Sequence, residues 1–289
     1  MKPAVFQHVA PTAIDEVLSL LKEHSPDAII LAGGQSLVPL MNFRLSCPSI
    51  LIDLNHVQDL AYIRDDGESL AIGAMTRERT IENSDLVRRF APLLHEATSH
   101  IAHLPIRSRG TIGGSLANAD PAAEYPAVCV ALDFDMVIRS ARGERRVRAG
   151  DFFLGLLTTA LEPDELLVEI LVPKAPPRTG SAFVELARRH GDFALAGVAT
   201  QITCSGDDIA EVRMAACGVG PGPIRLAAAE DIIMRDGLTD ATAKRAAKAA
   251  AEEVDPSNDL HATASYRRHL TGIMASRALL RAGERARAP

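Results

Sequence analysis

Two short glycine-rich stretches carry the residues whose spacing suggests chemistry. The first is AGGQSL, residues 32–37, and the second is TIGGSLANADPAAEYP, residues 111–126. In each, a pair of adjacent glycines is followed by a serine, Ser36 or Ser115. Bare backbone before a helix leaves N–H groups open to an anion, which is what a phosphate site requires. Either stretch alone would indicate a tight turn, but the two together favour phosphate binding.

Neither stretch matches the common nucleotide-binding or hydrolase motifs. A nucleoside triphosphatase loop ends in Lys followed by Ser or Thr, and neither stretch has that ending. The segment GVGPGP at 218–223 resembles GxGxxG, but its prolines remove N–H donors that a pyrophosphate needs, so it predicts a turn. A GxSxG nucleophile elbow would need a glycine where Val38 stands, so a serine hydrolase is not supported.

Other polar candidates lie around the second stretch. Asp120 and Glu124 could be a general acid–base pair, or groups that contact a cofactor or support the structure. His100 and His103 are three residues apart, but no third zinc ligand is evident, so local packing or solvent exposure is favoured. The cysteines form no CxxC pair, which excludes the usual close-spaced zinc and iron–sulfur patterns. We therefore expect no metal ligands in this chain.

Composition indicates an ordinary globular protein. The 289 residues are enough for about two domains, and the hydrophobic and charged fractions of 47% and 24% are typical. The formal net charge of −6 gives no support to nucleic-acid binding. No secretory signal is visible, and no run approaches ~18 uncharged apolar residues. With its scattered thiols, the sequence predicts a cytoplasmic protein without a transmembrane segment.

The elements that would position the first stretch are a strand before it and a helix after it. Residues 28–31 predict a buried strand that leads into Gly33, and Ser36 is expected to cap a short helix over residues 37–42. The other elements expected before residue 173 are strands at 50–54 and 166–172, hairpins about 65–67 and 142–143, and helices over about 14–21, 84–100 and 122–132.

Three prolines in PKAPPRTG, residues 173–180, mark a domain boundary, because proline cannot continue a central strand. We expect a first domain at 1–174 and a second at 180–289. The elements expected after the boundary are strands at 182–188, 194–204 and 209–218, followed by helices near 224–235, 240–253 and 263–282. Strands and helices are mixed without strict alternation, which favours an α+β fold.

The two stretches closely resemble the FAD-binding motifs of the medium, flavin-carrying subunit of molybdenum hydroxylases. That family includes aerobic carbon monoxide dehydrogenases, xanthine dehydrogenases and bacterial N-heterocycle hydroxylases. RRHGDFALAGVA (188–199) and CGVGPGPIR (217–225) are similar to its C-terminal domain, so the resemblance covers nearly the whole chain. It implies a two-subdomain FAD-binding domain of the PCMH (vanillyl-alcohol-oxidase-like) type, with subdomains about 1–56 and 57–174. A smaller α+β domain, with a three-stranded antiparallel sheet and helices, would follow.

The resemblance also implies which residues contact FAD. The pyrophosphate would lie against Ala32, Gly33, Gly34, Gln35, Ser36 and Leu37. The second motif would supply Thr111, Gly114 and Ser115, with Ala117, Asn118 and Asp120 nearby. Ile101 and Ala102 would line the cofactor, Glu124 would hold the adenosine ribose, and Leu167 would pack on the flavin or adenine. Phe193 would lie near the isoalloxazine ring or else in the core.

Two positions depart from the family pattern. Relatives often have His where this chain has Gln35, and a polar side chain is kept there. Many have Lys near the position of Glu185, reaching toward the flavin, so here the sign of the charge is reversed. The second departure bears on the flavin potential and not on FAD binding.

The resemblance implies an electron-transfer subunit of an oxidoreductase. A molybdopterin-binding large subunit would oxidise the substrate with water as oxygen source, and [2Fe–2S] clusters of a small subunit would pass electrons to FAD. FAD would pass them to an external acceptor, in a dimer of heterotrimers. One alternative is a self-contained FAD-dependent oxidoreductase of the same FAD-binding fold, against which the GDFALAG segment argues. Another is a non-enzymatic scaffold with two glycine turns.

Overall fold

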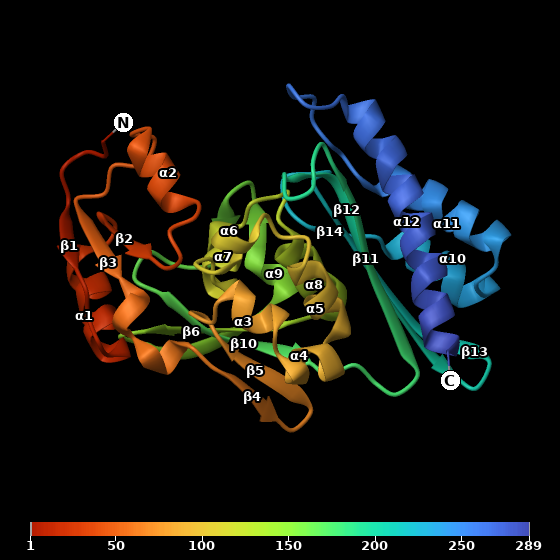
Figure 1. The fold of residues 1–289 in the computed structure, drawn as a ribbon, viewed down its shortest axis with the longest axis horizontal. Helices are drawn as coiled ribbons and strands as arrows, with labels where there is room; N and C mark the ends of the chain where they lie inside the picture. The colour runs from red at the N-terminus through yellow and green to blue at the C-terminus, as the bar shows by residue number, and fades with distance from the viewer. Residues whose placement is uncertain (1, 289) are drawn as a thin grey trace.

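Three main sheets follow one another along the chain (Figure 1). In this computed structural model, which describes residues 2–288, a three-stranded parallel sheet comes first and a five-stranded antiparallel sheet second. A four-stranded antiparallel sheet comes last, and β8 (Phe153–Gly155) and β9 (Thr158–Thr159) form a separate small hairpin. This arrangement confirms the α+β fold expected from the mixed order of strands and helices.

The N-terminal sheet carries the first glycine stretch at one edge. Its strand order is β1-β3-β2, and α1 packs on it through Val17, Leu18 and Leu21. Strand β2 ends at Leu31, directly before the glycine stretch, and α2 begins directly after Ser36. The bounds in this part are β1 (Gln7–Val9), α1 (Ile14–His24), β2 (Ala28–Leu31), α2 (Leu37–Asn42), β3 (Ile50–Asp53) and the short 3-10 turns Leu54–His56 and Gln58–Leu60.

The central strands of the five-stranded sheet pack against a hydrophobic core on each face, whereas its edge strands are largely exposed. Its order is β4-β5-β10-β6-β7, and successive residues of a strand point to opposite faces. In β5, Leu70 and Ile72 join the core under the helices, whereas Ala71 joins the core that contains α1. The strands are β4 (Ile63–Asp66), β5 (Ser69–Gly73), β6 (Asp135–Ser140), β7 (Gly143–Arg148) and β10 (Leu166–Pro173). Both predicted hairpins, β4–β5 and β6–β7, are confirmed.

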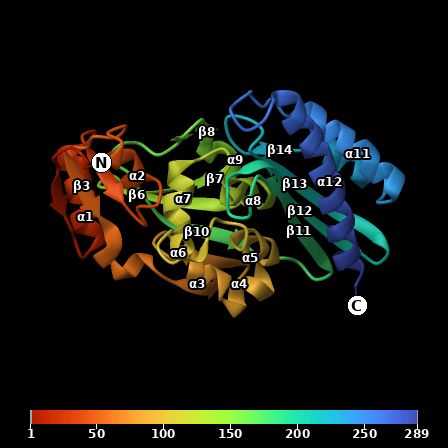
Figure 2. The same ribbon diagram turned by 45° about the horizontal axis from the view of Figure 1, so that its top comes forward.

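Short helices cover the face of this sheet that is turned toward the C-terminal sheet (Figures 1 and 2). They are α3 (Glu78–Glu82), α4 (Asp85–Phe90), α5 (Pro92–Thr98), α6 (Leu104–Arg107), α7 (Ile112–Asn118), α8 (Glu124–Leu132) and α9 (Ala149–Phe152). The single helix expected over 84–100 is wrong, because α4 ends at Phe90 and α5 begins at Pro92. Proline lacks the N–H that a continuous helix needs and restricts the preceding residue. Ala91 accordingly has φ −137° and ψ 60°.

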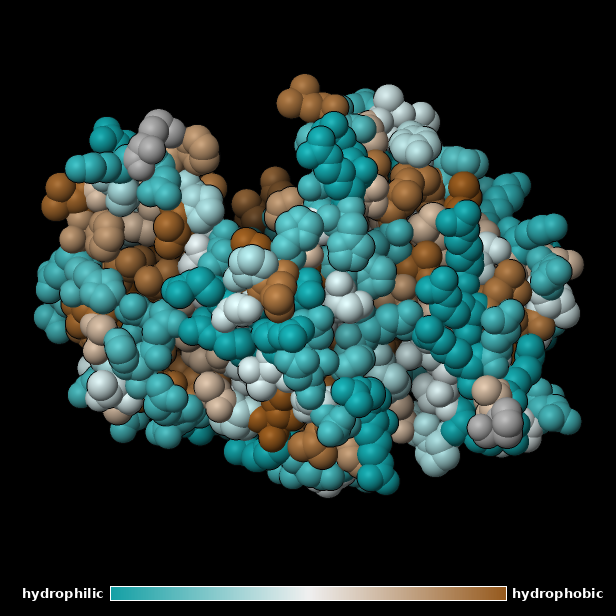
Figure 3. All heavy atoms as spheres, viewed as in Figure 1, coloured by the Kyte–Doolittle hydropathy of each residue, from teal (hydrophilic) through white to brown (hydrophobic). Residues whose placement is uncertain are grey.

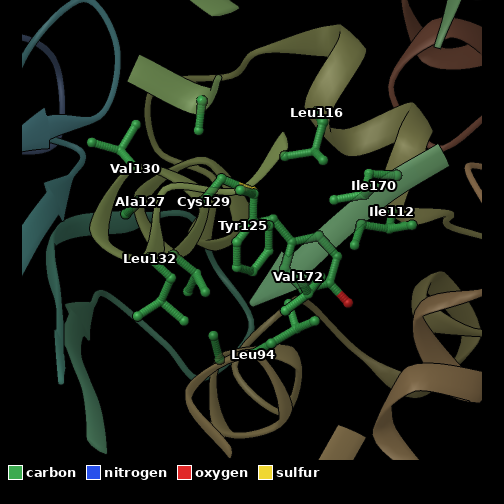
Figure 4. Close-up of a cluster of buried hydrophobic side chains, with 14 of the residues drawn as sticks. Leu94, Ile112, Leu116, Tyr125, Ala127, Cys129, Val130, Leu132, Ile170 and Val172 are labelled. Atoms are coloured by element: carbon green, nitrogen blue, oxygen red, sulfur yellow. The ribbon is translucent and has the colours of Figure 1, made fainter. Parts of the chain in front are cut away.

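Helix α8 is buried over its whole length, because it lies between α5 and the strands β12 and β13. Figure 4 shows the ring of Tyr125 among apolar side chains that include Leu94 and Val172. Its hydroxyl is satisfied by a hydrogen bond with Thr98 Oγ1 at 3.0 Å. This helix joins the segment that carries the second glycine stretch to the C-terminal sheet in one core.

The strands of the C-terminal sheet lie in the order β11-β12-β13-β14. One face of this sheet packs on α8, and helices α10–α12 cover the opposite face (Figure 1). The bounds are β11 (Thr179–Ala187), β12 (Ala194–Ser205), β13 (Asp208–Cys217), β14 (Ile224–Arg225), α10 (Ala227–Asp236), α11 (Asp240–Glu253) and α12 (Ala264–Arg287). The three long strands were expected, but β14 is an additional edge strand. Ile224 and Arg225 pair with β13, so the helix expected from residue 224 starts at Ala227.

The helices of the described part of the chain include none that is both long enough and apolar enough to span a membrane.

We expect Gly113→Ala to lower the free energy of unfolding by about 1–3 kcal/mol, because it overpacks the contact between α7 and the residue that follows β5. A Cβ at Gly113 would lie 2.5 Å from Ala74 Cβ and 2.6 Å from Ala74 O. Urea unfolding of the purified chain measures the loss. Gly150→Ala is the matched control, since a Cβ there meets nothing within 4 Å. Equal stability of the two variants would contradict the packing argument.

Candidate functional site

A cavity of about 720 Å³ lies where the three parts of the chain meet. Its wall combines the loop after β2, the segment from α6 to α8, the residues around Leu167, and the loop before β12. Figure 3 shows the surface hollowed between the side of the molecule that carries α2 and the central helices, with hydrophobic residues in the hollow. Its volume is in the range of pockets that enclose small-molecule cofactors.

Every residue that the resemblance implies for FAD lies on this one wall. The members are Ala32, Gly33, Gly34, Gln35, Ser36, Leu37, Ile101, Ala102, Thr111, Gly114, Ser115, Ala117, Asn118, Asp120, Glu124, Leu167 and Phe193. They come from segments that lie far apart in the sequence, so the fold assembles the set.

The first loop presents a run of free N–H donors. From Gly33 to Leu37, no backbone N–H has a hydrogen-bond partner within residues 2–288. Gly34 has φ +74°, a left-handed conformation that favours glycine. Ser36 precedes α2, but its hydroxyl makes no capping hydrogen bond, so the predicted cap is wrong. The hydroxyl and the N–H groups are therefore available to an anion.

The second loop differs, since its N–H groups are already bound by the protein. The acceptors for Ile112, Gly113, Gly114 and Ser115 are Thr76 O, Ala74 O, Thr111 Oγ1 and Thr111 O, at 3.1, 2.9, 3.1 and 3.0 Å. Thr111 thus caps α7. The expectation that this glycine pair also offers bare donors is wrong. The loop contributes shape, together with the hydroxyl of Ser115, to the cavity wall.

The glycines bring the two loops together. A Cβ at Gly33 would lie 2.4 Å from Arg109 O and 2.8 Å from Gly110 Cα. A Cβ at Gly114 would lie 3.3 Å from Ala32 Cβ. The missing side chain of Gly33 therefore allows the two loops to touch, and the run of free N–H donors begins at this residue.

Two buried carboxyl groups line the cavity. Burial, and next the charge of Glu185, raise the pKa of Glu124 to about 8. Burial raises the pKa of Glu78 to about 7, against the opposing charges of Arg107 and Arg77. Near neutral pH, a protonated Glu124 can both donate to and accept from hydroxyl groups, as recognition of a ribose requires. Asp120 is used structurally, since its Oδ1 accepts from Ala122 N at 2.9 Å.

The C-terminal part contributes the loop with Gly191, Asp192 and Phe193. Gly191 has φ +87°, and a Cβ there would lie 2.4 Å from His103 Cε1, so this loop is seated on the start of α6. Phe193 is 66% exposed at the cavity wall, so it is not a core residue.

The histidines face different partners. His100 Nδ1 lies 3.4 Å from Glu185 Oε1, and its ring packs on Phe183, whereas His103 lines the cavity. The Glu185 side chain is buried and is not part of the cavity wall. Among residues 2–288, no three His, Cys, Asp or Glu side chains are grouped so that they could hold a metal ion.

Several wall residues were not assigned to the cofactor from the sequence. They are Leu21, Ala28, Ile29, Ile30, Leu54, Ala74, Met75, Glu78, His103, Ile106, Gly110, Gly113, Ala123, Leu161, Pro163, Glu165, Leu166, Gly191 and Asp192. Gly110 directly precedes the second motif, and Gly113 is part of it, so their positions in the sequence were a signal for including both. Glu78 had no such signal, because it stands alone on a short helix far from both motifs in the sequence.

Family models match almost the whole chain. The FAD binding domain in molybdopterin dehydrogenase matches residues 4–175, and the CO dehydrogenase flavoprotein C-terminal domain matches residues 181–282. Caffeine dehydrogenase subunit beta of Pseudomonas sp. (strain CBB1) is 41% identical over 286 residues, covering 99% of this chain and 97% of that protein.

Solved structures share the fold over the full length. A carbon monoxide dehydrogenase from Hydrogenophaga pseudoflava, which lacks the Mo-pyranopterin moiety of its molybdenum cofactor, superposes with TM-score 0.96 at 39% identity, covering 99% of each chain. Quinoline 2-oxidoreductase from Pseudomonas putida 86 superposes with TM-score 0.95 at 36% identity, covering 100% of each chain.

The free energy of unfolding should fall as pH rises from about 5 to about 8, partly because of Glu124. The unfolded chain releases this proton near 4.5, the ordinary pKa of a glutamate, whereas the folded chain holds it to about 8. Glu124→Gln should remove that part of the slope and raise stability at pH 9 relative to pH 5 by about 4 kcal/mol, at about 1.4 kcal/mol for each pH unit over which only the folded chain holds the proton.

Urea unfolding of the FAD-free chain across this pH range measures the slope. Glu68→Gln, at an exposed carboxyl, is the control and should leave the profile unchanged. A Glu124→Gln profile parallel to that of the unaltered protein would show that this carboxyl does not stay protonated in the folded state.

Proposed function

This chain belongs to the FAD-binding medium subunits of the molybdopterin-dependent hydroxylases, and we propose that it holds FAD in the cavity described above and relays electrons through it. The observation that carries the proposal is the run of free N–H groups from Gly33 to Leu37 on the wall of a cavity of about 720 Å³. A pyrophosphate diester carries two negative charges and needs several donors at close range.

The residues on the wall fit FAD part by part. The N–H groups of residues 33–37 and the hydroxyl of Ser36 would hold the pyrophosphate, with Ser115 opposite. Glu124, kept protonated by burial, would exchange hydrogen bonds with the ribose of the adenosine. Leu167 and the exposed ring of Phe193 would supply apolar contact to the aromatic rings.

When bound, FAD would connect one-electron iron–sulfur chemistry with acceptors of one or two electrons. The role of this chain is to bind the cofactor, orient it and set its surroundings. The apolar side chains of the wall lower the polarity around the cofactor, and the exposed Phe193 marks a side of the cavity where an acceptor or a partner would approach.

We propose a molybdopterin-binding large subunit and a [2Fe–2S] small subunit as partners, in a dimer of heterotrimers. Similar chains are medium chains of multi-subunit complexes of the CO dehydrogenase type. Large apolar side chains are exposed in and after α2 and around the β8–β9 hairpin, next to segments that line the cavity. The members are Val38, Leu40, Phe43, Leu45, Leu154, Leu156 and Leu157. Exposed apolar groups gathered near a site favour a protein partner.

The domain division is part of the same proposal. An FAD-binding domain at 1–174, with subdomains about 1–56 and 57–174, and a C-terminal domain at 180–289 are supported by the end of β10 at Pro173 and the start of β11 at Thr179. We also propose a cytoplasmic location, supported by the four cysteines, none of which is paired in a disulfide.

The isolated protein should be yellow, with one FAD per chain that acid precipitation releases into the supernatant. Gly33→Val should lose most of its FAD, because the new side chain would meet Arg109 O and separate the two loops. Flavin absorbance per chain measures the content. Gly150→Val, at a glycine with open space around it, should keep FAD. Unchanged flavin content in Gly33→Val would contradict the assignment of the loop.

The assembled complex should show rapid bleaching of the flavin absorbance when its substrate is added in a stopped-flow instrument. The purified single chain should show none with the same substrate, since the substrate site and the clusters would lie on the partners. Substrate-driven bleaching of the single chain would instead favour a self-contained flavin oxidoreductase.

A further inference from the structure

Glu78, at the start of α3, has a buried carboxyl group without a hydrogen-bond partner. The residue is 5% exposed, and its Oε2 is enclosed and unpartnered among the described residues. Glu78 nevertheless lines the cavity. Since Oε2 is enclosed, we infer that the other carboxyl oxygen faces the cavity.

The neighbouring arginines do not bind this carboxyl, because their N–H groups are used elsewhere. Arg107 donates to both carboxyl oxygens of Glu82 at 3.1 Å and to Ile101 O at 2.7 Å. Arg77 donates to Asn55 Oδ1 at 2.5 Å and to Arg109 O. Glu78 therefore receives their charge but none of their hydrogen bonds.

The carboxyl lies at the junction of the two glycine loops. Glu78 N donates to Gly110 O at 3.0 Å, and a Cβ on Gly110 would lie 2.5 Å from Glu78 Oε2. Gly110 is also the residue against which Gly33 packs. The side chain thus reaches the cavity next to the loop whose N–H donors are free.

We propose that Glu78 is a neutral carboxylic acid in the FAD complex and that the hydroxyl on its cavity-facing oxygen donates a hydrogen bond to a pyrophosphate oxygen. This inference rests on the proposed function. An enclosed Oε2 without a donor is tolerable as the carbonyl-type oxygen of a neutral acid but costly as half of a carboxylate. A carboxylate would also repel the two negative charges of the pyrophosphate, whereas the acid attracts them.

The surrounding charges agree with a proton held near neutral pH. Burial raises the pKa of Glu78 to about 7, and the charges of Arg107 and Arg77 oppose this rise. The titratable and charged groups on the elements packed around it are Arg77, Glu82, His95, Arg107, Arg109, Glu124 and Tyr125, with the exposed Asp85, Arg88 and Arg89 of α4 farther along. A nearby pyrophosphate would add negative charge and hold the proton more firmly.

FAD affinity should consequently fall as pH rises. Below a pH of about 7 the acid donates, and above it the free protein loses the proton, so binding must take one up. The dissociation constant of the FAD-free full-length chain, followed by quenching of flavin fluorescence between pH 6 and 8.5, should rise about thirtyfold, since uptake of one proton weakens binding tenfold for each pH unit above about 7.

Two substitutions separate the donor from the charge. Glu78→Gln keeps an N–H donor and cannot ionise. Its dissociation constant for FAD should therefore lose the pH step that comes from uptake of one proton, and at pH 8.5 it should bind FAD more tightly than the unaltered chain. Glu78→Leu has no donor, so its affinity should be about tenfold weaker at pH 6, with the same flat profile. Glu124→Gln removes the other raised carboxyl of the cavity and should leave the Glu78 step in place.

A measurement on the unaltered chain does not depend on how the variants fold. Calorimetric titration with FAD at pH 7.5, in buffers of different ionisation enthalpy, should show net proton uptake, and this uptake should persist in Glu124→Gln. ADP-ribose, which carries the same pyrophosphate without a flavin, should show the same pH step. A step with FAD alone would overturn the assignment to the pyrophosphate.

The outcomes distinguish the two proposals. If the chain binds FAD but shows no proton uptake, or if the Glu78→Gln profile superimposes on that of the unaltered chain, the role of Glu78 is wrong and the FAD site stands. If the unaltered chain binds no FAD at any pH, the proposed function fails, and the role of Glu78 fails with it.

Discussion

The backbone of the first glycine loop lies directly on the backbone of Arg109 and Gly110, and the cavity depends on this contact. A Cβ at Gly33 has no room there, since it would approach Arg109 O to 2.4 Å. The contact joins the loop after β2, at the edge of the N-terminal sheet, to the segment just before α7. These two segments lie far apart in the sequence. This contact fixes one wall of the cavity. It thereby holds in place the loop whose N–H groups, from Gly33 to Leu37, are free.

The two glycine stretches look equivalent in the sequence but differ in the structure. The first keeps its N–H groups free, whereas the second gives them to Thr111, Thr76 and Ala74. The difference is produced by the neighbours: a strand end and a capping threonine lie against the second loop, and nothing comparable accepts from the N–H groups of residues 33–37 within the described chain. Local sequence shows where bare backbone occurs, but tertiary contacts decide whether its donors remain available.

Strands and hairpins followed from the sequence wherever hydrophobic alternation and turn residues agreed, as in β4–β5 and β6–β7. The helical spacing of apolar residues over 84–100 predicts one helix, whereas Pro92 divides the segment into α4 and α5. The edge strand β14 has two residues, too few for a periodic pattern. The wall residues that belong to the two motifs were accessible through resemblance, whereas Glu78 was not, because tertiary contacts bury it: α3 packs on α4, α5 and α6, and Gly110 lies against its carboxyl group.

Helix α8 also determines how the chain divides. All nine of its residues are buried, and the core around it includes Phe183, Ala199 and Cys217 from beyond the proline-rich linker. A fragment that ended at the linker would turn this apolar helix toward water and would be prone to self-association. The two segments matched by separate family models therefore share one hydrophobic core, although the linker separates them in the sequence.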